Sequence, residues 1–147
     1  MIDLTSSMFI NGIKDELILA ARLLLAALFL IFGWRKLRDF SGTTSQMEQL
    51  GVPAPLLAAG VATFMELPVA FAVAVGAFTR PLALFMFFYT LGTALAGHRY
   101  WTKTGADYVD SMDSFYKNLA IMGGFLLLVV TGPGKYSIDA LWSVPAP

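Results

Sequence analysis

Residues 17–34 read LILAARLLLAALFLIFGW, with one charged side chain, that of Arg22. A helix needs about 20 apolar residues to cross the roughly 30 Å hydrocarbon layer of a bilayer. Helices of a soluble bundle each carry a polar face, and residues 23–32 have none, so this stretch predicts a membrane-spanning helix. We do not expect a cleaved signal peptide, because a basic flank, WRKLR, follows in place of a small-residue cleavage site.

Three further apolar segments follow along the chain, at about residues 55–78, 81–98 and 116–131. None of them alternates polar and apolar side chains, as the strands of a membrane barrel do. The sequence therefore predicts an all-α protein, a bundle of four transmembrane helices forming a single domain over residues 1–147. Residues 35–54, with a short helical stretch, and residues 99–115 are the expected polar loops.

The composition agrees with a membrane protein and excludes several other classes. Hydrophobic residues other than glycine make up 57 % of the chain, above the roughly 45–50 % that soluble domains reach with glycine counted. Charged residues make up 14 %, against about 25 % in ordinary domains. The formal net charge is zero, so the chain lacks the excess of Lys and Arg that nucleic-acid binding needs. We expect the lipid bilayer, and no nucleic acid, among its partners.

The chain has no cysteine and a single histidine, His98. Disulfides, thiolate catalysis and cysteine-ligated metal or iron–sulfur centres are therefore excluded. One histidine within the chain cannot form a bis-histidine haem site or a histidine cluster. We expect no metal site, and any redox group would belong to something that the protein binds.

The basic residues predict a membrane orientation. Lys and Arg are enriched in cytoplasmic loops. The two longer loops contain Arg35, Lys36, Arg38, Arg99 and Lys103, with Lys117 at the border, whereas the opposite side contains Lys14, Arg80 and Lys135. This distribution favours both longer loops in the cytoplasm and both termini outside.

Two opposite charges fall inside the predicted spans. Arg22 lies about one turn from the centre of the first helix, and Glu66 lies near the centre of the second. Their depths differ by only about 5 Å at 1.5 Å per residue, a gap that an arginine side chain can bridge. Intramembrane charges suggest function by default. We consider an ion pair that locks the bundle, a polar pocket for a quinone, a proton or a small substrate, and separate partners for the two residues. Pro68, close after the acid, predicts a kink in the helix.

A second polar group should form at the other face of the membrane. Lys36 follows the first helix, His98 ends the third, and Asn118 begins the fourth. The helix directions place all three at the same side. They either satisfy helix ends and headgroups or form the rim of a binding site, with His98 able to transfer protons. At the opposite side, residues 132–139 read GPGKYSID, in which Ser137 or Asp139 could cap a short final helix.

These features together resemble the DoxX family of small four-helix membrane proteins. The resemblance rests on Arg22, on GWRKL at residues 33–37, on GVP at residues 51–53 and on Glu66 followed by GAFTR at residues 76–80, together with Asn118 and the closing GPGKYSID. It covers residues 17 to 142, nearly the whole chain. It implies a multi-pass protein of the inner (plasma) membrane, of a kind often linked with redox systems, including a subunit of a thiosulfate:quinone oxidoreductase.

The first functional hypothesis is a membrane subunit that binds quinone, with no covalently bound cofactor, or that anchors a partner oxidoreductase. Its candidate polar pocket consists of Arg22, Glu66, Lys36, His98 and Asn118. The second hypothesis is a non-catalytic scaffold or assembly subunit of a membrane complex. The third is a small-metabolite transporter, which would need a homo-oligomer to form a pore, since no inverted repeat is present.

Overall fold

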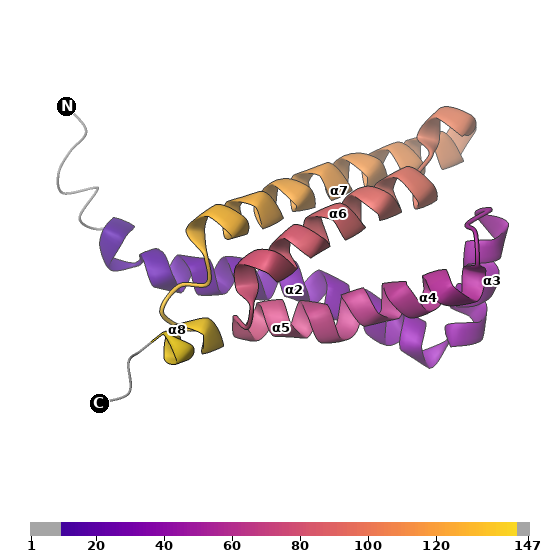
Figure 1. Ribbon diagram of the computed structural model, residues 1–147. Helices are drawn as coiled ribbons and strands as arrows, with labels where there is room; N and C mark the ends of the chain where they lie inside the picture. Colours follow the sequence, from indigo (N-terminus) through magenta and orange to yellow (C-terminus); the bar gives the residue numbers. More distant parts are fainter. Residues whose placement is uncertain (1–9, 144–147) are drawn as a thin grey trace, which may run out of the picture.

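The computed structural model describes residues 10–143, and these form helices joined by short connections, with no strand among them (Figure 1). The first spanning helix is α2 (Lys14–Arg38). The second is continuous but built in three pieces, α4 (Pro55–Phe64), a π-helical turn (Met65–Val69) and α5 (Ala70–Val75).

The third span is α6 (Thr79–Gly97), which a 3₁₀ turn (Tyr100–Thr102) extends, and the fourth is α7 (Gly105–Thr131). All four spans are long and apolar enough to cross a membrane. The predicted all-α bundle of four transmembrane helices is thereby confirmed. Two short helices, α3 (Phe40–Gln49) and α8 (Ile138–Trp142), lie outside the spans.

Helix α7 begins at Gly105 rather than near residue 116, so most of the expected loop at residues 99–115 is helical. Hydropathy misses this part because Asp107, Asp110 and Asp113 are polar and exposed. Their spacing of three places them on one face of a helix. An acid in the first turn, here Asp107, also interacts favourably with the helix dipole. The fourth helix thus extends beyond its apolar part.

The bundle consists of two antiparallel helix pairs. Helices α6 and α7 pack along their length, and α2 packs against the α4–α5 span. Figure 1 shows that the two pairs converge near α5 and α8 and diverge toward α3. At the diverging end, Nη2 of Arg99 donates a 2.6 Å hydrogen bond to the carbonyl of Leu50. This bond ties the end of α6 to the end of α3.

The apolar core lies where the two pairs meet. The ring of Phe29 on α2 is 5.6 Å from the ring of Phe125 on α7, measured between centroids. Met86 on α6 is fully buried beside them. Most other leucine and phenylalanine side chains on the helices are exposed in the monomer, for example Leu24 and Leu127. A water-soluble protein would not tolerate so large an apolar surface, and a bilayer covers it.

Candidate functional site

Glu66 is the centre of a buried polar cluster at the middle of the bundle. The residue as a whole is 5 % exposed. One carboxylate oxygen, Oε2, lies 2.6 Å from Nζ of Lys36, and the other, Oε1, accepts a 2.5 Å hydrogen bond from the hydroxyl of Tyr89. The Glu66 cluster, defined as Lys36, Glu66 and Tyr89, therefore joins three of the four spans.

The backbone around Glu66 departs from the α-helix. Pro68 lacks an N–H and cannot complete the α-helical hydrogen bond to the carbonyl of residue 64. The helix responds with the π-helical turn Met65–Val69, which includes both Glu66 and Pro68. Such turns inside helices occur frequently at functional sites. Pro68, which predicted a kink close to Glu66, thus lies in a distorted turn of the helix.

A glycine brings Lys36 to Glu66. A Cβ atom placed on Gly33 would lie 2.8 Å from the backbone carbon and the Cβ of Glu66, which is closer than two such atoms can approach. Only glycine lets α2 approach the second span at this point. Lys36 follows one turn later on the same face of α2, so the close approach places its ammonium group at the carboxylate.

The surroundings of the cluster are apolar and aromatic. The ring centroid of Tyr89 is 6.4 Å from that of Phe29, and Nζ of Lys36 lies 5.8 Å from the centroid of the Phe32 ring. Charge–charge interactions are strengthened in such a low-dielectric environment. The Lys36 side chain keeps 21 % of its surface exposed, against 7 % for Glu66. The cluster is therefore accessible from the lysine side.

Arg22 is not the partner of Glu66, so of the three arrangements considered for these residues the structure shows separate partners. Arg22 is 1 % exposed, and within residues 10–143 its guanidinium donates hydrogen bonds only to backbone carbonyls. Nε and Nη2 bond to the carbonyl of Ala74 at 3.2 and 3.0 Å. Nη2 also bonds to the carbonyl of Tyr136 at 2.8 Å, and Nη1 bonds to that of Pro133.

Helix ends explain why carbonyls suffice for this buried cation. Ala74 is in the last turn of α5, where carbonyls lack an intrahelical partner. The C-terminal end of a helix also carries a partial negative charge. Pro133 and Tyr136 belong to the segment after α7. Arg22 thus fastens the closing segment, residues 132–137, to the end of the second span.

Ser137 and Asp139, the two residues expected to cap the short final helix, each cap a helix, but the two helices are different. Oγ of Ser137 accepts a 3.2 Å hydrogen bond from the amide of Ala140 and caps α8, as predicted. Asp139 instead caps α6, because its carboxylate accepts hydrogen bonds from the amides of Phe78 and Thr79 at 2.7 and 2.8 Å. The bonds of Asp139 therefore hold α8 against the start of α6 at this end of the bundle.

His98 and Asn118 are not members of the Glu66 cluster, and Asn118 lies within α7 rather than at its start. His98 follows Gly97 at the end of α6, nine residues after Tyr89, which corresponds to about 13 Å along a helix. Within the described residues, neither His98 nor Asn118 forms a side-chain hydrogen bond or ion pair with Lys36 or Glu66. Of the three residues expected at one rim, only Lys36 reaches the intramembrane acid.

Tyr89 is the member of the cluster that the sequence reading missed. It ends the aromatic run FMFFY at residues 85–89, which is typical of lipid-facing or core positions. The hydroxyl of Tyr89 could have indicated its role, since a buried tyrosine hydroxyl usually requires a hydrogen-bond partner. An intramembrane carboxylate is the strongest acceptor available to it.

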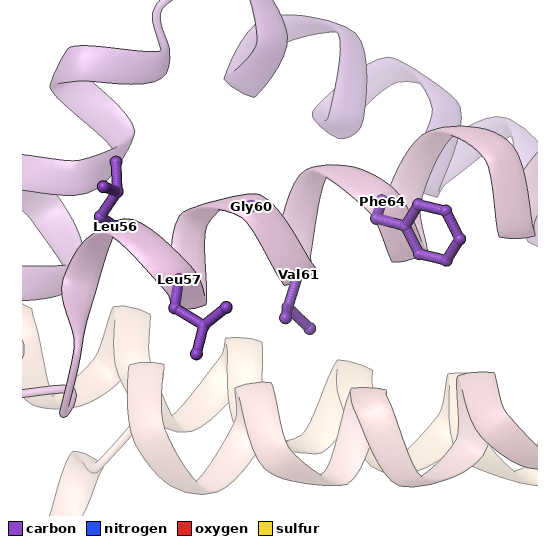
Figure 2. Close-up of a pocket in the computed structure, with 5 residues that line it drawn as sticks. All are labelled: Leu56, Leu57, Gly60, Val61 and Phe64. Atoms are coloured by element: carbon purple, nitrogen blue, oxygen red, sulfur yellow. The ribbon is translucent and has the colours of Figure 1, made fainter.

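A groove on the outer face of α4 does not belong to this site. It has a volume of about 500 Å³ and is lined by Leu56, Leu57, Gly60, Val61 and Phe64 (Figure 2). At 100° per residue, Phe64 and Glu66 point to opposite sides of the helix. The groove contains no polar side chain, and we interpret it as a lipid-facing surface.

Four spans and a buried ion pair at mid-bundle define an integral membrane protein of the four-helix type. Residues 17–99 match the DoxX family, and the chain belongs to that family. It is 50 % identical to inner membrane protein YphA of Escherichia coli (strain K12) over 126 residues, which is 86 % of this chain and 90 % of that protein.

A second relative is inner membrane protein YqjF of the same organism, which is 42 % identical over 129 residues, covering 88 % of this chain and 94 % of that protein. No solved structure matches the chain. The spans and these relatives make it a multi-pass protein of the inner membrane.

Proposed function

We propose that this protein is a membrane subunit of a redox system, and that its Glu66 cluster binds the headgroup of a quinone. The observation that carries the proposal is the ion pair of Lys36 and Glu66 in the apolar interior of the bundle. Binding sites for small apolar molecules typically place a few polar groups in an otherwise apolar surrounding. Ionisable groups within a membrane are costly and mark sites of function.

The donors and acceptors of the cluster fit a quinone. Quinone carbonyl oxygens accept hydrogen bonds and donate none. The ammonium group of Lys36 has three N–H donors, one of which bonds to Glu66, and its side chain is partly exposed. Lys36 would therefore bind the carbonyl oxygen, while Glu66 and Tyr89 hold the lysine in place.

A bound quinone would supply two-electron chemistry that takes up two protons. The electrons must come from the cofactor of a partner oxidoreductase, because the chain lacks residues for a metal redox centre of its own. Lys36 would stabilise the negative charge that develops on the reduced headgroup. Glu66 and Tyr89 form a hydrogen-bonded route by which a proton could reach Lys36.

The test is the quinone content of protein purified in mild detergent, measured by extraction and chromatography. Wild type should retain quinone, and Glu66→Gln and Lys36→Met should each retain at least about tenfold less, since removing one partner of a buried charge pair costs roughly 2–5 kcal/mol of binding. Glu16→Gln is the matched control, because Glu16 pairs with Lys135 at the other end of the bundle. Absence of quinone from wild type, or equal content in Glu66→Gln, would contradict the proposal.

A scaffold subunit is the second candidate, and Arg22 favours it. This buried cation bonds to carbonyls of its own chain, which is a structural role. The broad exposed apolar surface offers contacts to a larger complex. Exchange of the ion pair, Lys36→Glu with Glu66→Lys, separates the two candidates. If the exchanged pair restores wild-type activity of the host complex, the pair has a structural role and the scaffold candidate is supported. If activity is lost although the bundle folds, the pair binds the ligand and the quinone candidate is supported.

A further inference from the structure

A second groove, of about 530 Å³, lies between the N-terminal half of α2 and the C-terminal half of α7. Its walls are apolar, with Leu24 and Leu28 on one side and Ile121 and Gly124 on the other. Its two polar lining residues are Lys14 and Thr131. These two lie at the same end, because the two helices run antiparallel (Figure 1). The groove is thus polar at one end and apolar along the rest of its length.

The length of the groove matches one leaflet of a bilayer. Along α7, Ile121 and Thr131 are ten residues apart, about 15 Å, and along α2, Lys14 and Leu28 are fourteen residues apart, about 21 Å. One leaflet contributes roughly half of the 30 Å hydrocarbon layer. A lipid acyl chain that starts at the Lys14 end would therefore fill the groove to about the middle of the membrane.

Small side chains keep the groove open. Gly124 forms part of the wall, and a Cβ atom at this position would already lie 3.0 Å from Cδ2 of Leu25. A larger residue at 124 would occupy the space of the groove or displace Leu25.

The polar end carries two cations, Lys14 and Arg80, that lie outside the ion pairs of the described residues. Among residues 10–143 the ion pairs are Lys36–Glu66 and Lys135–Glu16, so Lys14 and Arg80 have none there. The acids next to Lys14 have other partners: Asp15 accepts a hydrogen bond from the amide of Lys135 at 2.9 Å, and Glu16 accepts one from the hydroxyl of Tyr136 at 2.9 Å.

Arg80 lies beside the same end of the groove. A Cβ atom on Gly132, the residue after Thr131, would lie 3.0 Å from Nη2 of Arg80. Lys14 is exposed at the mouth of the groove and Arg80 is exposed at its side. Two cations therefore face the level at which lipid phosphates lie.

We propose that the α2–α7 groove is a binding site for an anionic phospholipid. One acyl chain lies between Leu24 and Gly124, and the phosphate binds Lys14, with Arg80 at its flank. Charge complementarity selects an anionic lipid over a zwitterionic one. The site is separate from the Glu66 cluster, and it does not depend on quinone binding.

Delipidated protein in detergent, incubated with equal amounts of phosphatidylglycerol and phosphatidylethanolamine, tests the site by native mass spectrometry. Wild type should retain phosphatidylglycerol in excess. Lys14→Ala should reduce that excess about fivefold, the effect of one lysine at an anionic membrane surface. Leu24→Trp should fill the groove and lower retention of both lipids. Both residues are exposed, and Leu24 is 76 % exposed, so we expect both variants to fold.

The matched controls are Lys103→Ala, in the connection before α7, and Leu23→Trp, whose position is 50 % exposed and outside the groove. Both should behave as wild type. Equal retention of the two lipids by wild type would overturn the proposal. So would wild-type behaviour of Lys14→Ala or of Leu24→Trp, or an equal loss in Leu23→Trp.

Discussion

Nζ of Lys36 lies 2.6 Å from Oε2 of Glu66 and joins the end of the first spanning helix to the middle of the second. The pair depends on Gly33, which lets the two helices approach, and on Tyr89, which holds the second carboxylate oxygen. Removing one member leaves the other charge without a partner in an apolar surrounding, whereas removing both leaves no charge behind.

A double-mutant cycle on this pair should therefore be strongly non-additive. Glu66→Gln and Lys36→Met should each lower the free energy of unfolding by about 3 kcal/mol, the usual cost of breaking a buried pair. The double variant should be less destabilised than the sum of the two by at least about 1 kcal/mol. Denaturant titration in detergent, followed by circular dichroism, measures all four proteins, and additive effects would show that the two side chains do not interact.

The spans could be predicted from the sequence because crossing a bilayer is a requirement on composition over about 20 residues. The stretch at residues 17–34 meets it without reference to any other helix. The closing GPGKYSID was equally visible in the sequence, since turn residues act locally. What hydropathy could not show was the polar first part of α7, which begins at Gly105.

The partners of the intramembrane charges could not be predicted, because they depend on how each helix is rotated about its axis. Depth alone made Arg22 and Glu66 candidates for a pair. The contact of Gly33 with Glu66 sets the rotation of α2 and presents Lys36 to the acid. Arg22 then faces the carbonyl of Ala74, which has no amide partner at its helix end.

Arg22→Lys should loosen the closing segment. A lysine ammonium cannot reproduce the planar fork that bridges the carbonyls of Ala74 and Tyr136. Hydrogen bonds to charged groups contribute roughly 1.5–3 kcal/mol each, so the open state should become at least about tenfold more populated. Trypsin cleavage after the exposed Lys135 should accelerate by the same factor.

The control for this experiment is Arg38→Lys, an exposed position in the last turn of α2. Its cleavage rate after Lys135 should equal that of wild type. Unchanged cleavage in Arg22→Lys would mean that the carbonyl contacts of Arg22 do not hold the segment closed.

Gly76→Ala should be more damaging than Gly51→Ala, although both glycines have positive φ angles, +75° and +70°. Alanine at either position should cost about 1–2 kcal/mol for the left-handed conformation. At Gly51 nothing lies within 4 Å of the added Cβ, whereas at Gly76 the Cβ would collide with that of Ser137 and lie 2.6 Å from Nη1 of Arg22. Overpacking should add about 1–3 kcal/mol. Equal unfolding free energies for the two variants would show that the closing segment moves aside freely.

Gly33→Ala and Gly60→Ala should change stability in opposite directions, although both glycines lie within helices. Nothing surrounds the added Cβ at Gly60, so alanine there should stabilise the protein by up to about 1 kcal/mol through helix propensity. At Gly33 the added Cβ would lie 2.8 Å from backbone and side-chain atoms of Glu66, and the helices must separate, at a cost of about 1–3 kcal/mol.

Separation of the helices in Gly33→Ala would also move Lys36 away from Glu66. The coupling energy from the double-mutant cycle should therefore fall when the cycle is repeated in the Gly33→Ala background and persist in the Gly60→Ala background. An undiminished coupling with alanine at 33 would show that the close approach of the helices is not what places the lysine at the acid.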